Sequence, residues 1–408
     1  MTWFLNKCFK NRGAICAALL YCLSAFPALA QSVSGRLTLE TYSYFSEPLF
    51  DQQRDTGVYP SLSGDLEFSF DLSDKTDLEF RGKLRFGAAE DREDLFFVDA
   101  EQATLLWTKN DTRLRFGILQ ERWGVLTTHS ALDVVNQTDF IENIDGSQRL
   151  GQPAVALETS LWPSVDALLL LSPGGRERRL PDTELRYRLV PAPLAEPVFE
   201  DGQGRLEFAT RLRFQFETIG INLNYFTGHS REPEFQSVIS GGRVTEFLPF
   251  YRVIEQAGLS IEIPAGSYVL RAEAFHRSGQ TGGSFYGYAF GIERYFYGVN
   301  SGQSDLFVFA EAFYDKRSSS APLTLFDSDI SIGMEWLLND SLGRSMGIRL
   351  IHDWETSASL WEFEYGQRLK DDVLIDVKFR LPTNTKTDAA LSGFQGDEEL
   401  QVGLTWKF

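Results

Sequence analysis

The sequence predicts an all-β protein, an antiparallel transmembrane β-barrel of about 18 strands whose third outer loop folds inward. Three observations lead to this fold class. Many segments alternate apolar and polar residues, which is the period of a strand with two different faces. Short polar connections alternate along the chain with longer ones. An export signal precedes a chain that has no long apolar helix, as expected for a barrel in an outer membrane.

The first 30 residues have the three parts of a secretory signal peptide. A positive region with Lys7, Lys10 and Arg12 precedes a short apolar core at 13–26. The residues Ala28-Leu29-Ala30 then form an A-x-A cleavage site. The apolar core is shorter than the roughly 20 residues that a spanning helix needs, which disfavours a membrane anchor. We therefore assign 1–30 to a signal peptide and 31–408 to one barrel domain.

Composition excludes several classes of function. All three cysteines lie within the signal (Cys8, Cys16, Cys22), so the mature chain can have neither a disulfide scaffold nor a thiol site. Removal of the signal changes the formal net charge from −18 to −21, which argues against a nucleic-acid partner. Aromatic residues make up 13% of the chain, in keeping with a membrane barrel.

The last segment, 400–408, shows the alternation most clearly. Its apolar face consists of Leu400, Val402, Leu404, Trp406 and Phe408, and its other face of Gln401, Gly403, Thr405 and Lys407. This pattern predicts a strand with one face in lipid and the other toward a polar lumen. The pair Trp406 and Phe408 also resembles the assembly signal of bacterial outer-membrane barrels. The alternative is an amphipathic edge strand of a soluble sheet.

Connections of two kinds interleave along the chain. The short turns fall near 73–75, 109–111, 163–164, 217–218, 264–266, 300–302, 339–341 and 370–371. The longer connections are 46–57, 88–94, 122–152, 172–203, 229–248, 277–283, 316–324, 355–358 and 383–397. Barrels of this kind have short turns at one end and longer loops at the other. The segmentation gives 18 strands, and 16 stays open because the strands near 154–171 are short and 249–263 is irregular.

Charged residues recur in phase with the predicted lumen. The basic set is Arg81, Lys83, Arg85, Arg113, Arg115, Arg211 and Arg213. The acidic set is Asp65, Glu67, Glu262, Glu273, Glu293, Glu362 and Glu364. Charge facing lipid would cost about 2–4 kcal/mol at mid-membrane, so a polar interior is expected. The two sets either oppose each other across a channel and select solutes by charge, or pair across neighbouring strands and solvate a filled barrel.

The alternation stops at 122–152, the third outer loop. We expect this loop to narrow the lumen with Trp123, Gly124, Asp133, Asn136, Asp139, Glu142 and Asp145. Gly124 can turn sharply out of the strand because glycine tolerates positive φ. Asp133 and Asn136 can brace a turn through their side chains. Whether these two also meet a solute is left open by the sequence.

Two resemblances support a channel. The third loop of general porins resembles this one, because it folds inward and carries carboxylates opposite basic residues. Trp123-Gly124 followed by 133–139 also resembles the W-G…D-V-V-N-P-x-D signature of a poorly characterised group of porin-like outer-membrane proteins of Gram-negative bacteria. Segments 149–153 and 172–181 are similar to that group as well, whereas Gln137 stands where the group usually has proline.

The resemblances imply an outer-membrane channel for passive passage of small solutes. Its partners would be outer-membrane lipid and lipopolysaccharide, the barrel-assembly machinery and small solutes, and a homo-oligomer is compatible with the resemblance. No cofactor is expected, although acidic outer loops such as 90–94 could hold Ca²⁺ or Mg²⁺ weakly. Catalysis is disfavoured because neighbours in a strand, such as His229 and Ser230, face opposite sides.

Outer-membrane barrels can also have functions other than passive passage of solutes. A receptor with an N-terminal plug and 22 strands would need a longer chain. A gated, export or lipid-handling barrel that works with partner proteins stays open, because Phe307, Phe309, Leu168 and Leu170 are apolar residues in phase with the lumen. A mainly structural outer-membrane anchor is the third alternative.

Overall fold

The computed structural model describes residues 32–73, 78–89 and 92–408. The predicted signal peptide lies outside them, and so do residues 90–91 of the acidic 90–94 run. The barrel strands are β1 (Ser32–Tyr44), β2 (Gly57–Ser73), β3 (Leu78–Ala89), β4 (Arg92–Lys109), β5 (Thr112–Leu119), β6 (Gln152–Trp162), β7 (Val165–Ser172), β9 (Glu207–Phe216), β10 (Ile219–His229), β13 (Val253–Ala265), β14 (Tyr268–Ser278), β15 (Phe285–Gly298), β16 (Ser304–Asp315), β17 (Ser328–Leu337), β18 (Ser345–Asp353), β19 (Ser359–Lys370), β20 (Val373–Thr383) and β21 (Glu399–Lys407).

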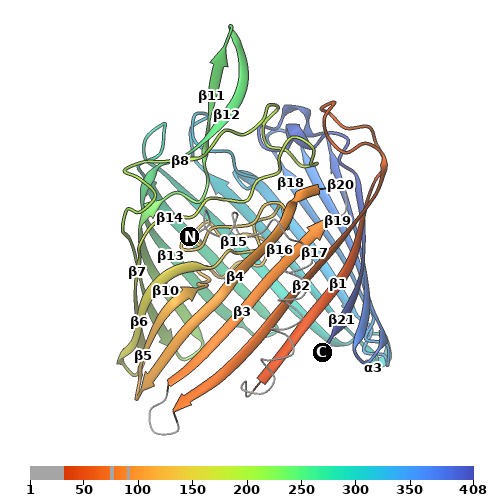
Figure 1. Cartoon of the computed structure of the whole chain (residues 1–408). Helices are drawn as coiled ribbons and strands as arrows, with labels where there is room; N and C mark the ends of the chain where they lie inside the picture. The colour runs from red at the N-terminus through yellow and green to blue at the C-terminus, as the bar shows by residue number, and fades with distance from the viewer. Residues whose placement is uncertain (1–31, 74–77, 90–91) are drawn as a thin grey trace.

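These strands form one closed sheet of 18 (Figure 1). Each strand pairs antiparallel with its neighbour along the chain, and β1 pairs with β21 to close the barrel. The prediction of an 18-stranded antiparallel barrel is therefore confirmed, and the alternative of 16 is excluded. The segment 154–171 supplies two short but complete strands, β6 and β7.

The irregularity near 249–263 has a structural cause. Strand β12 (Arg243–Tyr251) belongs to a separate sheet with β11 (Glu234–Ser240) and β8 (Val198–Phe199), and the barrel resumes only at β13. Strands β11 and β12 form a hairpin that projects beyond the rim of the barrel (Figure 1). The sequence predicts a connection at 229–248, but it does not predict this hairpin.

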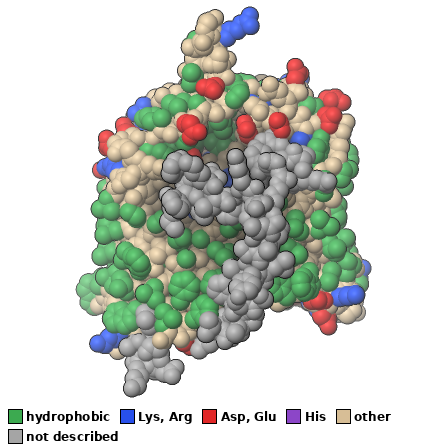
Figure 2. All heavy atoms as spheres, in the orientation of Figure 1, with side chains coloured by type: hydrophobic (Ala, Val, Ile, Leu, Met, Phe, Trp, Pro, Cys, Tyr) green, Lys and Arg blue, Asp and Glu red, His purple; other side chains and the backbone are tan. Residues whose placement is uncertain are grey.

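The strand phasing follows from the two-residue period. Leu39 lies opposite Leu62 and Leu404, and the three side chains face outward. On the other face, the Thr38 and Thr405 hydroxyls are 3.0 Å apart, inside the barrel. On the face that Figure 2 shows, hydrophobic side chains cover much of the outer surface between the two ends, and charged side chains gather toward those ends. This is the surface expected of a barrel surrounded by lipid.

The two ends of the described chain meet at the closing seam. Gly35 N–H donates to Phe408 O at 3.0 Å, and Phe408 N–H donates to Gly35 O at 3.1 Å. A side chain at position 35 would collide with the Phe408 ring, so glycine fits this contact. The Trp406 indole donates to Asp372 at 3.0 Å.

The short and long connections lie at opposite ends of the barrel. Tight turns with left-handed residues such as Asn110, Glu217 and Asn339 join strands at one end. Val299–Gly302 (α3) forms another of these turns. The third loop, residues 120–151, folds into the lumen, where Asp139 bonds to Arg85 of β3 and to Arg179 of the fourth loop, residues 173–206. Within the described residues, no helix is long and apolar enough to cross a membrane.

Candidate functional site: the third loop and the lumen

The third loop is packed onto one side of the barrel wall. Trp123, Val134 and Val135 are buried against Ala156 and Leu168 on β6 and β7. Each fully buried aliphatic side chain contributes about 1.5–3 kcal/mol to stability. This packing therefore fixes the part of the loop that contains Trp123, Val134 and Val135. Leu168 and Leu170 do face the lumen, as the sequence predicts, but the loop covers them.

Asn136 ties the two ends of the loop together. Its amide nitrogen donates to Leu119 O and to Leu150 O, each at 2.9 Å, and its amide oxygen accepts the Glu121 N–H at 2.7 Å. Only 1% of Asn136 is exposed. Because its amide nitrogen and oxygen are both hydrogen-bonded inside the protein, Asn136 braces the two ends of the loop.

Asp133 also makes contacts within the loop. Its carboxylate accepts the Trp123 N–H at 3.2 Å and pairs with the Arg149 guanidinium, whose Nε lies 2.5 Å away. Burial raises the pKa of Asp133, and Arg149 opposes this shift. Gly124 has a φ of 94°, and a Cβ there would overlap the Ser130 hydroxyl, so the turn after Trp123 requires glycine.

Two glutamates on the far wall hold the middle of the loop. Glu273 on β14 accepts the N–H groups of Val125 and Leu126 at 2.6 and 3.3 Å, and also the Ser130 hydroxyl. Glu311 on β16 accepts the N–H groups of Thr127 and Thr128 at 2.6 and 2.9 Å. Four consecutive backbone donors are thus bound by two wall carboxylates. We call this arrangement the carboxylate clamp.

On the opposite side, Arg85 of β3 holds the later part of the loop. Its guanidinium lies 2.5 Å from Asp139, 3.2 Å from Glu142 and 3.2 Å from Glu101. Asp139 has no exposed surface, whereas 34% of the Glu142 side chain is exposed. Burial raises the pKa of Glu142; Asp139 adds to this shift and Arg85 opposes it.

Asp145 reaches a third part of the wall. It lies 2.9 Å from Arg349 on β18, which also pairs with Glu362 on β19. Glu362 in turn lies 2.9 Å from Arg380, which pairs with Glu399 at 3.0 Å. The loop therefore contacts β3, β14, β16 and β18, and it crosses the lumen.

Most of the other predicted lumen charges pair with a residue of a neighbouring strand, whereas Arg81 pairs with Glu79 of its own strand, β3. Their contacts are Arg36 with Asp65, Lys83 with Glu67, Arg271 with Glu262 and Glu293, Lys378 with Glu364, and Arg81 with Glu79. Arg115 pairs with Glu121 at 2.5 Å, and Arg211 donates to Arg122 O at 3.3 Å. Within the described residues, Arg113 and Arg213 have no ion pair. Only Arg85 of the predicted basic set bonds to the predicted loop carboxylates.

The fourth loop is a part of the site that the sequence analysis missed. Arg179 pairs with the same carboxylate oxygen of Asp139 as Arg85. The buried Gln137 donates to Arg176 O at 3.0 Å, so the residue that replaces proline links the third loop to the fourth. Arg186 is fully buried, pairs with Asp397 at 3.0 Å and donates to the carbonyl oxygens of Arg54 and Ser46. The run of five arginines in 176–188 was the available signal.

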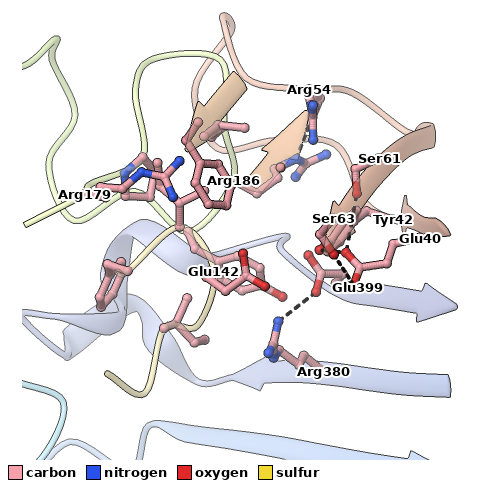
Figure 3. Close-up of a pocket in the computed structure, with 18 of the residues that line it drawn as sticks. Glu40, Tyr42, Arg54, Ser61, Ser63, Glu142, Arg179, Arg186, Arg380 and Glu399 are labelled. Atoms are coloured by element: carbon pink, nitrogen blue, oxygen red, sulfur yellow. Dashed lines mark hydrogen bonds and ion pairs between the residues drawn. The ribbon is translucent and has the colours of Figure 1, made fainter. Parts of the chain in front are cut away.

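Several open spaces lie beside the third loop, and two of them share part of their lining. One, of about 810 Å³, lies between Tyr42, Arg186 and Arg380 (Figure 3). The second, of about 980 Å³, lies among Arg36, Lys83 and Asp376. Glu40 and Ser63 on the wall and Glu142 on the loop border both spaces. We call this shared boundary the neck, defined as Glu40, Ser63 and Glu142.

The histidines are engaged in contacts of other kinds. His229 bonds to Glu207 at 3.1 Å and to Glu200 O at 2.9 Å, while the Ser230 hydroxyl donates to Glu232 O. His129 stacks on Phe326 with centroids 4.2 Å apart, and burial lowers its pKa to about 4. The Ser130 hydroxyl donates to Glu273. Neither adjacent pair is arranged as a nucleophile with its base.

One described group of carboxylates has the spacing of a metal site. Oxygens of Asp327, Asp329 and Asp353 lie within 4.8 Å of one another near the long-loop end. Burial and Asp353 raise the pKa of Asp327 to about 6.

No family model matches the sequence, and no curated protein matches it. Solved structures do match. Pseudomonas aeruginosa OpdK with vanillate is 10% identical, with a TM-score of 0.51 over 93% of this chain and 99% of that chain. Pseudomonas aeruginosa OccK1 (OpdK) is 9% identical, with a TM-score of 0.50 over the same shares. The outer membrane channel DcaP of Acinetobacter baumannii is 9% identical, with a TM-score of 0.46 over 93% and 98%.

The likeness to the two Pseudomonas structures concerns the fold. This chain shares their closed antiparallel β-barrel fold, which has 18 strands here.

Proposed function

We propose that the chain is an outer-membrane channel of a Gram-negative bacterium for passive passage of small solutes. The observation that carries the proposal is the pair of open spaces that meet at the neck, beside an inward loop fastened to several strands. A lumen lined by charged side chains favours small polar solutes, and charges at its narrowest part set their selection. The fold of the neighbouring structures and the Trp123-Gly124 signature support the same function.

The structure favours Glu142 as the solute-facing carboxylate of the loop. It borders both spaces and is partly exposed, whereas Asp139 is buried between two arginines. Asp133, Asn136 and Asp145 have the contacts of residues that hold the loop in shape. In this proposal Glu40 and Glu142 form the acidic border of the neck, and Arg380 lies beside it (Figure 3). Arg85 lies 3.2 Å from Glu142 and lines the second space.

Conductance of the purified protein in planar lipid bilayers tests the proposal. An open channel gives stepwise conductance with the loop intact. Silence that ends only when 125–148 are deleted would instead support a gated or export barrel that works with partner proteins. Silence of both forms, with the barrel correctly folded, would favour the structural anchor and contradict both channel functions.

The remaining parts of the proposal concern partners. The barrel-assembly machinery would recognise β21, the strand that closes the barrel, through Trp406 and Phe408. Lipopolysaccharide would surround the end of the barrel that carries the long loops. Further copies of the chain could pack side by side, which cross-linking in membranes would measure. No cofactor, catalytic activity or nucleic-acid partner is part of the proposed function.

A further inference from the structure

A shallow apolar groove lies on the outer wall of the barrel. It follows β16, where the outward side chains of Val308 and Ala310 are small, between bulkier side chains on the neighbouring strands. Those neighbours include Ile292 on one side and Ile332 and Met334 on the other. The lining is almost wholly apolar, so the groove is suited to a hydrocarbon chain.

Arg294 lies at one end of this groove. The strand register places it between Tyr268 and Val308 on the outward face. Its guanidinium lies 4.6 Å from the Tyr268 ring centroid and 4.2 Å from that of Phe296, and it donates to the Tyr268 hydroxyl at 2.6 Å. Its Nε is buried without a hydrogen-bond partner. Within the described residues, no carboxylate lies within ion-pair distance of it.

A guanidinium that has no carboxylate partner on an apolar wall would be stabilised by a bound anion. A charge facing lipid costs about 2–4 kcal/mol at mid-membrane and about 0–1 kcal/mol near the interface. Arg294 is near an interface. Phe296, the next outward residue along β15, is in register with Leu306 on β16, which is in register with Trp336 on β17. Aromatic girdles mark the membrane boundary. The end of the barrel at which Arg294 lies carries the short turn Val299–Gly302. Short turns face the periplasm in barrels of this class.

We propose that this groove binds one phospholipid of the periplasmic leaflet. The phosphate would accept hydrogen bonds from Arg294 and the Tyr268 hydroxyl, and one acyl chain would lie along Val308 and Ala310. Guanidinium forms charge-assisted hydrogen bonds with phosphate, and among the described residues no carboxylate competes for Arg294. The inference rests on the barrel spanning a membrane, not on its conducting solutes.

Native mass spectrometry of the full-length protein in mild detergent tests the proposal. The protein is delipidated and titrated with phosphatidylglycerol or with diacylglycerol of the same acyl chains, which lacks the phosphate. One phosphatidylglycerol should bind per barrel, at least about tenfold more tightly than diacylglycerol, the difference expected for hydrogen bonds to a charged group. Arg294→Gln should remove this preference, and Arg294→Lys should restore part of it.

A second substitution tests the groove itself. Ala310→Trp fills the space beside Val308 but leaves the guanidinium in place, so it should also weaken phosphatidylglycerol binding about tenfold or more. Arg243→Gln, at the tip of the projecting hairpin, is the control with an arginine removed elsewhere. Each variant must first show the circular-dichroism spectrum and heat-resistant migration of the wild-type barrel.

Three results would overturn the proposal. Equal binding of the two lipids, or unchanged phosphatidylglycerol binding in Arg294→Gln, would remove the headgroup site. Disulfide cross-links between two copies of an Ala310→Cys variant would show that a second barrel covers the groove. Bilayer conductance of Arg294→Gln should equal that of the wild type, so a failure of the lipid site is distinguishable from a failure of the channel.

Discussion

Asp139 lies 2.5 Å from the guanidinium of Arg85 and has no exposed surface. Glu142 lies 3.2 Å from the same guanidinium, yet a third of its side chain is exposed. One arginine of the wall thus holds two carboxylates of the third loop in different surroundings. The first fastens the loop to β3, and the second borders the open lumen. Substitution of each should therefore change a different property of the channel.

Asp139→Asn should loosen the third loop. The change leaves Arg85 and Arg179 without their shared buried counter-charge, and breaking a buried pair costs about 3–5 kcal/mol. We expect larger fluctuations of the open-channel current and faster protease cleavage within 125–148. Current noise and cleavage sites of the reconstituted protein measure both effects. Noise and cleavage equal to the wild type would show that other contacts hold the loop.

Glu142→Gln should change ion selectivity and leave the fold intact. A charge about 8 Å from a passing ion in a water-like dielectric contributes about 0.5 kcal/mol, which is about a twofold change in relative permeability. The cation-to-anion permeability ratio should fall by about that factor, as measured by the reversal potential in a salt gradient. Glu246→Gln, on the exposed hairpin, is the matched control. An unchanged reversal potential would place Glu142 outside the conduction path.

The same residue predicts a pH dependence. Because burial raises the pKa of Glu142 above its usual 4.5, its charge is lost at a higher pH than that of an ordinary glutamate. The cation preference of the wild type should decline as the pH is lowered from 7 toward 4.5. In Glu142→Gln the part of this decline that comes from Glu142 should be absent. Identical pH profiles of the two proteins would contradict the assignment.

The barrel could be predicted from the sequence because its signal is local. Outward residues such as Leu39 and Leu404 recur every second position, and short turns recur at one end, so strand number and phasing follow from the chain itself. The sequence also predicted that Asn136 could brace the loop through its side chain. Its particular partners, Leu119 and Leu150, were not, because they depend on how the loop folds back.

The lumen contacts could not be predicted because they join distant parts of the chain. Glu311 and Thr128 are 183 residues apart, and only barrel closure brings β16 opposite the third loop. The position of the fourth loop depends likewise on Asp139 and Asp397, which receive its arginines. An alternating pattern predicts which side chains face the lumen but not which of them pair.

Asp327→Asn should stabilise the protein near neutral pH. Burial and Asp353 raise the pKa of Asp327 to about 6, so between pH 4 and 6 the folded state binds more protons at this residue than the unfolded state. Its contribution to stability therefore falls as the pH rises through that interval, by up to about 3 kcal/mol. Thermal unfolding should show a gain at pH 7.5 and little change near pH 4.

The control for this substitution is Asp111→Asn in an exposed turn, which should not alter the unfolding temperature at either pH. A loss of stability in Asp327→Asn at pH 7.5 would contradict the prediction. It would indicate that the ionised carboxylate is stabilised in the folded protein.

The carboxylate clamp should control how far the third loop can move. Glu273 and Glu311 each bind two consecutive backbone N–H groups, and a hydrogen bond to a charged group contributes about 1.5–3 kcal/mol. Glutamine keeps one acceptor oxygen but loses the charge and the second acceptor. We expect Glu273→Gln and Glu311→Gln each to raise the frequency of brief current transitions, and the double variant to exceed the sum of the two because both residues hold one segment.

Single-channel recordings and hydrogen exchange at 125–128 measure this release. Glu335→Gln is the matched control, since Glu335 lies on β17 in register with the lumen-facing Phe307 and outside the clamp. In the double variant the four amides should exchange faster, while those of Leu119 and Leu150 stay protected because the Asn136 brace is intact. Faster exchange at 125–128 and also at Leu119 and Leu150 would mean that the loop unfolds as a whole. Slow exchange at 125–128 would mean that packing of Val134 and Val135 holds the segment without the clamp.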